Sequence, residues 1–269
     1  MDINEFNMGI QYIPAKETKH LYHGSKNGIQ GRIMPNFKQA REKTDFGQGF
    51  YLSDNPVQAK TLICGRDDYD PVFYTMDLNL NKLNCVQIRE LPWALVIAQN
   101  RGYMENIKDA PLYEYVKHIY DGQDVIVGPI ADDRMALVLD DFFKGTITDV
   151  ALVACMEKLK LGTQYVAKTQ RACDQISITA TLPLGPEEIT EMRKQSRQNR
   201  IDGHNLVEPI KRRYRRTGIY FDQILEEGGE SFALRQHPIF HLQGTGRTVR
   251  DGGRPGPRLR QVRGILYEQ

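Results

Sequence analysis

An α+β fold is predicted from the way strand and helix signals follow one another along the chain. Short alternating apolar stretches, typical of half-buried strands, are mixed with stretches of helical periodicity. The two kinds of segment lack the regular strand–helix–strand order that builds a doubly wound parallel sheet. Of the 269 residues, 40% are hydrophobic and 26% are charged, with a net charge of +2. This composition supplies a core and excludes both a disordered polyelectrolyte and a uniformly basic nucleic-acid binder.

The sequence also predicts a cytoplasmic protein with no membrane partner. No apolar stretch approaches the roughly 20 residues of a membrane span. The segment MDINEFNMGI lacks the basic region and apolar stretch of a signal peptide. The cysteines are widely spaced and form no CxxC pair, which favours reduced thiols over disulfides or zinc ligands. They are Cys64, Cys85, Cys155 and Cys173.

Several segments have the apolar pattern of strands. They are residues 20–24, 49–53, 72–78, 124–130 and 175–182. Residues 72–78 alternate with period two, which predicts one face richer in apolar side chains. Residues 124–130 are apolar almost throughout and leave through Gly128-Pro129, which is typical of a buried strand.

Other segments have helical spacing. They are residues 54–65, 93–102, 109–119, 135–143 and 150–159. The first is expected to begin with Asp54 as its N-cap and Pro56 in its first turn. Gly65 and Gly102 are expected to end the first and second helices.

The composition changes near Pro183, which predicts three parts: 1–182, a basic helical extension over 183–243, and a flexible tail over 244–269. Between Arg193 and Arg216 nine basic residues stand against two acidic ones. The tail holds six arginines, six glycines and two prolines, too few apolar groups to order itself. The run KRRYRR suits a nucleic-acid contact, a solvated helix face or a surface that holds an acidic partner.

Common catalytic and metal-binding motifs are missing from the sequence. There is no Walker phosphate loop, no GxGxxG after a strand, no GxSxG elbow and no HExxH. His237 and His241 are four residues apart, but Pro238 lies between them and no third ligand is evident. We therefore predict no metal site.

Two other segments are more informative. LYHGS (21–25) places His23 at a strand end before a glycine, and DFGQGFYLSDNPVQA (45–59) places a glycine-rich turn before an aromatic strand. Glycines there would let the backbone approach a ligand closely. Taken separately, His23 could bond a neighbouring carbonyl, and Phe50 and Tyr51 could be core aromatics. Their order and spacing together are more specific.

With these segments the chain resembles the ADP-ribosyltransferase superfamily, in its poly(ADP-ribose) polymerase and diphtheria-toxin-like branch. Members have a strand ending in His-Gly, a glycine-rich turn into a Gly-aromatic-Tyr strand, and a third motif at the start of a later strand. The chain also resembles an uncharacterised bacterial family with this fold. The resemblance spans residues 18–182, through LYHGS, DFGQGFYLSDNPVQA, residues 93–101, DVIVGPIADD (124–133) and DQISI (174–178). It implies a split β-sheet core with surrounding helices, an NAD-binding domain over 1–182 and a helical C-terminal extension.

The resemblance implies that the protein binds NAD as a substrate and breaks its nicotinamide–ribose bond through an oxocarbenium-like transition state. His23 would donate a hydrogen bond to a hydroxyl of the adenosine-side ribose. The Gly24 backbone would pair with the nicotinamide carboxamide, and Tyr51 would stack on the nicotinamide ring. The other residues expected to bind NAD are Ser25, Gly49, Phe50 and Ser53.

At the third motif, where transferring members carry a glutamate, the aligned residue is Gln175. Its carbonyl can still accept a bond from a ribose hydroxyl but brings no negative charge. Gln175 could suffice, a carboxylate of Asp174, Asp132 or Asp133 could replace the glutamate, or the site could bind NAD without turning it over. Asp132 and Asp133 could equally be helix caps.

The function expected from the resemblance is NAD-dependent mono-ADP-ribosyl transfer to a protein or nucleic acid. A bacterial toxin or phage-defence effector, restrained by an antitoxin or other inhibitory partner, is also implied. The alternatives are a non-catalytic module that binds NAD or ADP-ribose, and an NAD glycohydrolase.

Overall fold

The computed structural model describes residues 7–14, 16–35, 44–65 and 69–230, and the fold of these residues is α+β, as predicted. The strands are β1 (Ile10–Pro14), β2 (Thr18–Ser25), β3 (Phe50–Ser53), β4 (Val72–Asn79), β5 (Asn84–Ile88), β6 (Val125–Pro129), β7 (Thr163–Ala167) and β8 (Ile176–Pro183). The helices are α2 (Pro56–Thr61), α3 (Glu90–Arg101), α4 (Pro111–His118), α5 (Asp133–Phe143), α6 (Asp149–Leu159), α7 (Gln170–Cys173), α8 (Pro186–Arg213) and α9 (Phe221–Glu230), with a short 3-10 turn η1 (Glu105–Ile107).

Every strand and helix predicted between residues 20 and 182 has a counterpart, but the sequence patterns missed β1, β5 and β7. The predicted cap of α2 was also wrong. Asn55 is the N-cap and accepts hydrogen bonds from the Val57 and Gln58 N–H groups, both at 3.1 Å. Pro56 occupies the first helical turn, and this places the capping side chain directly before it. Asp54 instead accepts a hydrogen bond from the Thr163 N–H at 2.8 Å.

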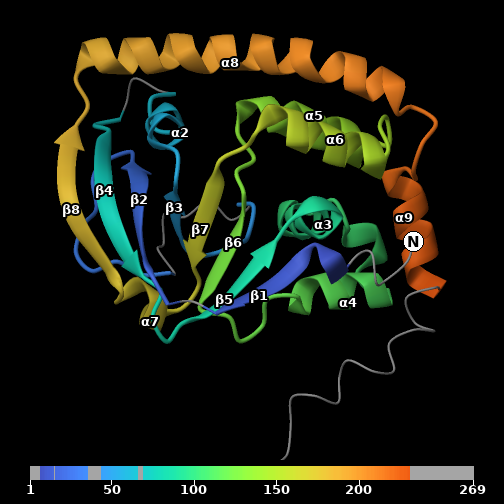
Figure 1. Cartoon of the computed structure of the whole chain (residues 1–269), viewed down its shortest axis with the longest axis horizontal. Helices are drawn as coiled ribbons and strands as arrows, with labels where there is room; N and C mark the ends of the chain where they lie inside the picture. The colour runs from blue at the N-terminus through green and yellow to red at the C-terminus, as the bar shows by residue number, and fades with distance from the viewer. Residues whose placement is uncertain (1–6, 15, 36–43, 66–68, 231–269) are drawn as a thin grey trace, which may run out of the picture. The chain divides into compact units, whose positions relative to one another are not determined.

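The strands form one eight-stranded mixed sheet in the order β1-β5-β6-β7-β3-β2-β4-β8 (Figure 1). Only β5 and β6 run parallel; the other neighbouring strands are antiparallel. The junction in the middle is narrow, because β2 and β3 are paired only at Tyr22 and Ser53. By contrast, β2 is paired with β4 over its whole length. The sheet therefore opens between β2 and β3 beyond this single pair.

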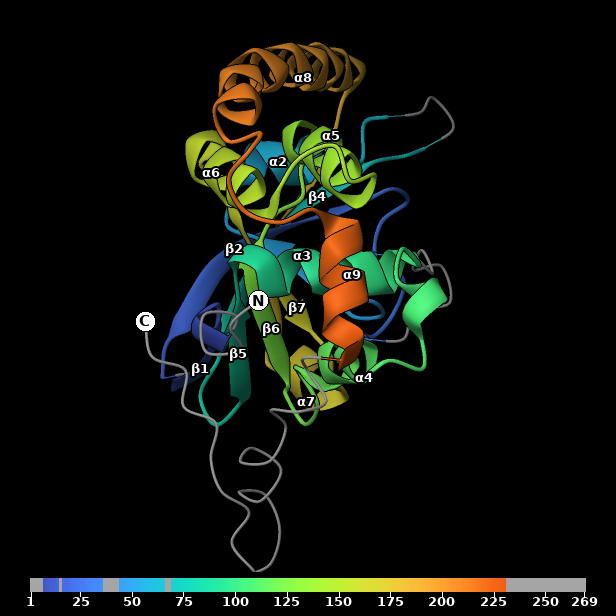
Figure 2. The same ribbon diagram turned by 90° about the vertical axis from the view of Figure 1, so that its right-hand side faces the viewer.

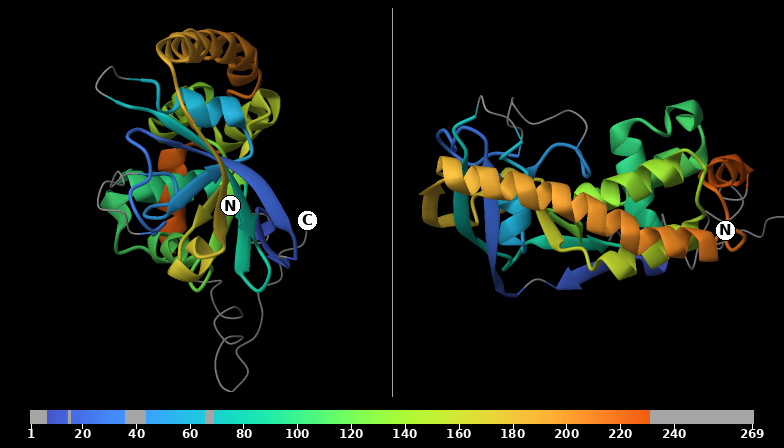
Figure 3. Two further views of the ribbon diagram at one scale, coloured as in Figure 1. Left: turned by 90° about the vertical axis from the view of Figure 1, so that its left-hand side faces the viewer. Right: turned by 90° about the horizontal axis from the view of Figure 1, so that it is seen from above.

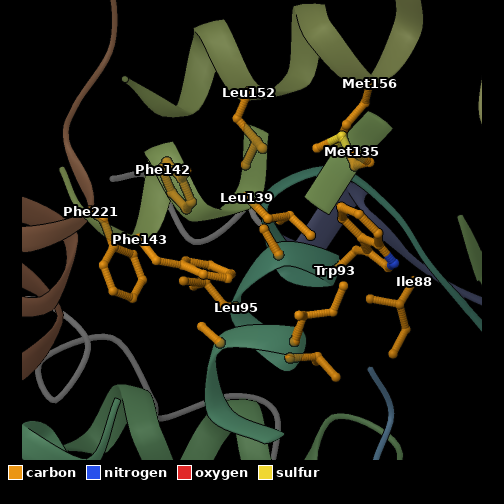
Figure 4. Close-up of a cluster of buried hydrophobic side chains, with 14 of the residues drawn as sticks. Ile88, Trp93, Leu95, Met135, Leu139, Phe142, Phe143, Leu152, Met156 and Phe221 are labelled. Atoms are coloured by element: carbon orange, nitrogen blue, oxygen red, sulfur yellow. The ribbon is translucent and has the colours of Figure 1, made fainter. Parts of the chain in front are cut away.

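The largest hydrophobic cluster lies between the sheet and helices α3 to α6. Trp93 of α3 is fully buried there, and its indole Nε1 donates a hydrogen bond to the Pro129 carbonyl at 3.0 Å. Phe142 and Phe143 of α5 pack with Phe221 of α9 at the other end of the cluster (Figure 4). α9 lies beside α3 and α4 in the side view (Figure 2). A second cluster is formed by β2, β3 and β4 around Leu21, Leu52 and Met76.

Helix α8 crosses over α2, α5 and α6 (Figure 3). Ion pairs fasten it at both ends: Lys60 of α2 lies 2.5 Å from Glu188, and Lys211 lies 2.6 Å from Asp141 of α5. Within the expected helical extension, α8 contacts α2, α5 and α6, and α9 contacts α4 and α5. The predicted tail over 244–269 lies outside the described residues. None of the helices in the described part of the chain is long and apolar enough to cross a membrane.

Candidate functional site

His23 lies where the sheet opens. Its Nδ1 is 2.7 Å from the main-chain oxygen of Tyr51, and its ring stacks on Phe50 with centroids 4.4 Å apart. A carbonyl oxygen only accepts hydrogen bonds, so Nδ1 carries the proton. Burial lowers the pKa of His23 to about 4, which keeps the ring neutral near pH 7. Nε2 is therefore a hydrogen-bond acceptor and not the donor that the resemblance implied.

The Nε2 atom of His23 has no hydrogen-bond partner among the described residues. In that part of the chain no fully buried side-chain nitrogen or oxygen lacks a partner. Nε2 is therefore not completely buried, although the imidazole as a whole is at least half-buried.

Tyr51 is held by its own loop. Its hydroxyl lies 2.6 Å from the Gly47 carbonyl oxygen and 2.8 Å from the Thr44 Oγ1, and it accepts a hydrogen bond from the Phe46 N–H at 3.1 Å. Burial raises the pKa of the phenol. Successive strand residues point to opposite sides, and Phe50 is the one that contacts His23. The structure thus brings Tyr51 to His23 through its main chain and places its hydroxyl in the 44–47 loop.

Two glycines expected at the site are explained by packing within the protein. A Cβ on Gly24 would lie 2.3 Å from the Ala59 carbonyl oxygen of α2. A Cβ on Gly49 would lie 2.5 Å from a methyl group of Val166 in β7. Both distances are shorter than real side chains allow, so helix and strand contacts require glycine at these positions.

The two expected serines lie at the ends of the site strands. The Ser53 hydroxyl donates to the Asn55 carbonyl at 3.1 Å and accepts from the Asn55 N–H at 3.0 Å. It thereby shapes the entry into α2. Ser25 ends β2 opposite Val72 of β4.

Gln175 is not brought to His23 and Tyr51, contrary to expectation. It lies between α7 and β8, and its main-chain carbonyl accepts a hydrogen bond from the Asn79 N–H at 3.0 Å. Asn79 is paired with Thr18 of β2, five residues before His23, which corresponds to roughly 16 Å along the strand. Because β8 pairs with β4 and not with β3, Gln175 also lies two strands away from β2.

The three aspartates considered as replacements for a glutamate hold the fold together instead. Asp174 accepts hydrogen bonds from Arg32, which lower the pKa of its carboxyl group. Asp132 is the N-cap of α5. Asp133 lies 3.1 Å from Arg200 and so connects α5 to α8.

Gln164 is the residue that the sequence patterns missed. It is buried on β7, the neighbour of β3, and is paired there with Ser53. Its Nε2 donates to Asp45 Oδ2 at 3.2 Å and to the Pro129 carbonyl at 2.8 Å. Both amide protons are therefore used. Its Oε1 has no partner among the described residues and, by the same reasoning as for His23, is not completely buried.

The loop between residues 44 and 49 is held from both sides. Asp45 Oδ1 lies 2.5 Å from the Arg101 guanidinium, and the Asn100 side chain donates to the Asp45 carbonyl at 3.2 Å. Lys168 donates to the Phe46 carbonyl at 2.6 Å, and burial lowers the pKa of this lysine to about 8. The loop is thus fixed next to Gln164.

The four cysteines are buried free thiols that form no disulfide. Burial raises the pKa of Cys85 and Cys155 to about 11 and that of Cys173 to about 12, which keeps these thiols protonated. In the described ranges, no group of three or more His, Cys, Asp or Glu side chains could hold a metal ion. His237 and His241 lie outside those ranges.

A cavity of about 440 Å³ lies away from the predicted site, where α9 meets the C-terminal ends of α3 and α5. Tyr103, Phe143, Lys144, Phe221 and Asp222 are among its lining residues. None of the residues predicted to bind NAD lines it.

Residues 19–178 match the family described as "Protein of unknown function (DUF3990)". The match covers more than half of the chain. The chain belongs to this family. The DUF3990 match contains β2, β3 and β7, which carry His23, Tyr51 and Gln164, and it ends before α8. No curated protein matches the chain.

Proposed function

We propose that this chain is an NAD-dependent mono-ADP-ribosyltransferase that modifies a macromolecule. One observation carries the proposal: His23 and Gln164 lie on the two strands that flank β3, and each has one acceptor atom without a hydrogen-bond partner among the described residues. Tyr22 pairs with Ser53 and Ser53 with Gln164, so the Gln164 side chain leaves the sheet on the face of Tyr22 and the His23 side chain leaves it on the other face. A dinucleotide bound by both residues would therefore pass through the opening between β2 and β3. Ribose hydroxyls are hydrogen-bond donors, so the two acceptors suit the two riboses of NAD.

In this proposal Gln164 replaces Gln175 as the residue of the third motif. Gln164 lies at the start of a later strand, and that strand is the neighbour of β3. Its Oε1 would accept a hydroxyl of the nicotinamide-side ribose, and His23 Nε2 would accept a hydroxyl of the adenosine-side ribose. Tyr51, whose side chain leaves β3 on the same face as Ser53 and Gln164, would supply the aromatic surface for nicotinamide.

The reaction exchanges one bond at the ribose C1′ atom for another. The bond between C1′ and the nicotinamide nitrogen breaks, and its electron pair leaves with neutral nicotinamide. The acceptor's nucleophile forms the new bond to C1′ and gives up its proton to solvent if it carries one. An amide oxygen stabilises the positive C1′ less than a carboxylate does, by on the order of 1–3 kcal/mol, or one to two powers of ten in rate.

A non-catalytic module that binds NAD or ADP-ribose is the second candidate. It is favoured by the neutral side chain at position 164. The nearest carboxylate at the site, Asp45, is already bound by Arg101 and Gln164. Binding would then require the same two acceptors without release of nicotinamide.

We further propose that the protein is cytoplasmic. Its partner, which is the protein or nucleic acid that it modifies or a protein that inhibits it, would approach the C-terminal end of α8. Arg212, Arg213, Arg215 and Arg216 are exposed there. By contrast, Lys211 is tied to Asp141 and Glu208. The exposed guanidinium groups would meet an anionic partner.

The test incubates the purified full chain with NAD and a cell lysate and searches protein and nucleic acid for added ADP-ribose by mass spectrometry. Gln164→Ala and Gln175→Ala are compared, because they separate the structural from the sequence-based choice. We expect loss of labelling in Gln164→Ala and retention in Gln175→Ala. Binding of NAD without nicotinamide release would favour the module, and release without any acceptor would favour the glycohydrolase. A chain that neither binds NAD nor releases nicotinamide would overturn the proposed function.

A further inference from the structure

The orientation of the Gln164 amide is set by acceptors on one side of it. Both contacts of Nε2, at 3.2 Å to Asp45 Oδ2 and 2.8 Å to the Pro129 carbonyl, are to atoms that cannot donate. A flipped amide would place Oε1 against these two acceptors. Because the amide group is planar, the observed orientation turns Oε1 away from Asp45 and from the Pro129 carbonyl.

Asp45 is itself prevented from turning. Its Oδ1 is bound to Arg101 at 2.5 Å while its Oδ2 receives Gln164. Its main-chain oxygen is held by Asn100 at 3.2 Å. The Asp45 side chain is 14% exposed, so water competes little for its oxygens. Each carboxylate oxygen therefore has a separate, fixed donor.

We propose that Asp45 is a positioning residue that holds the Gln164 carbonyl toward the ribose, and that it requires glutamine and not glutamate at position 164. This inference rests on the proposed function. The negative charge of Asp45 polarises the amide through the Nε2 hydrogen bond and increases the partial negative charge on Oε1. The neutral Gln164 side chain, polarised by Asp45, thus supplies part of the electrostatic stabilisation that a carboxylate would give to the positively charged C1′ atom.

The same contacts oppose a glutamate. In Gln164→Glu a carboxylate oxygen would replace Nε2 and face both the Asp45 carboxylate and the Pro129 carbonyl. Two carboxylates at such a distance cannot both ionise readily, which raises the pKa of one of them. When the carboxyl group introduced by this substitution is protonated, it keeps a donor on this side and a carbonyl on the other, as glutamine does.

The first experiment needs no variant. In the full-length protein, NMR exchange measurements on the Gln164 side chain report whether its amide protons are bonded. We expect both protons to exchange slowly with water. Rapid exchange of either proton would overturn the assigned orientation.

The second experiment measures nicotinamide release against pH for the wild type, Asp45→Asn and Gln164→Glu. Asp174→Asn is the matched control. Asp174 also accepts hydrogen bonds from one arginine, Arg32, and from one glutamine Nε2, that of Gln170 at 2.9 Å, but it lies far from the site. Asp45→Asn lets the Gln164 amide flip, and we expect kcat to fall about tenfold with little change in KM. Gln164→Glu should be active at acidic pH and lose activity as the carboxyl group ionises.

The outcomes separate this inference from the proposed function. A wild type that neither binds NAD nor releases nicotinamide overturns the proposed function. If the wild type is active, two results overturn the role of Asp45. One is a kcat for nicotinamide release that is the same in Asp45→Asn as in the wild type. The other is a rate of release by Gln164→Glu that exceeds that of the wild type at every pH. Thermal denaturation identifies a variant that has lost its fold, and the wild-type exchange measurement then decides.

Discussion

The His23 imidazole bonds the main-chain oxygen of Tyr51 at 2.7 Å, in the place where β2 and β3 are no longer paired as strands. The His23 side chain thus donates to the Tyr51 carbonyl, which would accept a main-chain hydrogen bond if the pairing of β2 and β3 continued. This bond fixes the tautomer of His23 and leaves Nε2 as an acceptor at the opening of the sheet.

The first prediction concerns the titration of His23. Its folded pKa of about 4 lies below the usual 6.5, so the unfolded chain binds more protons between these values. The contribution to stability is complete above pH 6.5 and is lost as the pH falls toward 4, by no more than about 3 kcal/mol. Urea unfolding of the wild type and His23→Asn across this range measures it. NMR titration supplies an internal control, since the hydrogen bonds that His118 donates to the carboxylates of Asp121 and Glu114 raise the pKa of His118. A His23 that titrates alongside His118 would contradict the prediction.

The second prediction concerns Gly24. An alanine there would place its Cβ 2.3 Å from the Ala59 carbonyl oxygen and 2.9 Å from Ile63, so α2 must move away from β2. We expect Gly24→Ala to lower the free energy of unfolding by about 1–3 kcal/mol, as overpacking does. Gly65→Ala is the control, because no atom of the described residues beyond its chain neighbours lies within 4 Å of its added Cβ. Equal midpoints of thermal unfolding for the two variants would count against the close approach of α2.

The third prediction concerns the arginines that follow Lys211. If the acceptor is a nucleic acid, replacing Arg212, Arg213, Arg215 and Arg216 by glutamine should weaken binding and reduce its dependence on salt. Each lost phosphate contact with a duplex lowers the slope of log K against log salt by about 0.9. Lys194→Gln, on the same helix but paired with Glu191, is the control. The binding constant is measured by fluorescence anisotropy. A binding constant that does not change with salt concentration, or that is the same in the arginine variant as in the wild type, would exclude a nucleic-acid surface here.

Much of the fold follows from sequence periodicity, because the core-facing strands and helices are long enough to display it. β7 (TQYVA) begins with two polar residues and has only three apolar residues after them, so neither an alternating pattern nor an apolar run marks it as a strand. Missing β7 also concealed Gln164. A polar residue near the start of a short strand after Gly162 was the only available signal.

The pairing of strands could not be read from the sequence. Gln175 begins a clear strand, but a period-two pattern does not say which strand lies next to it. The structure pairs β8 with β4 and β7 with β3, which separates Gln175 from His23 and brings Gln164 to the site strand instead. The modest reading of His23, a bond to a neighbouring carbonyl, is confirmed, and that bond is what leaves Nε2 available.

The most direct test follows the His23 ring nitrogens by NMR while NAD is added to the full-length protein. We expect the Nε2 resonance to shift as Nε2 accepts a hydrogen bond from a ribose hydroxyl, while Nδ1 stays bonded to the Tyr51 carbonyl and its resonance changes little. A His23 ring that is unperturbed at millimolar NAD would contradict the central claim that this opening in the sheet binds the dinucleotide.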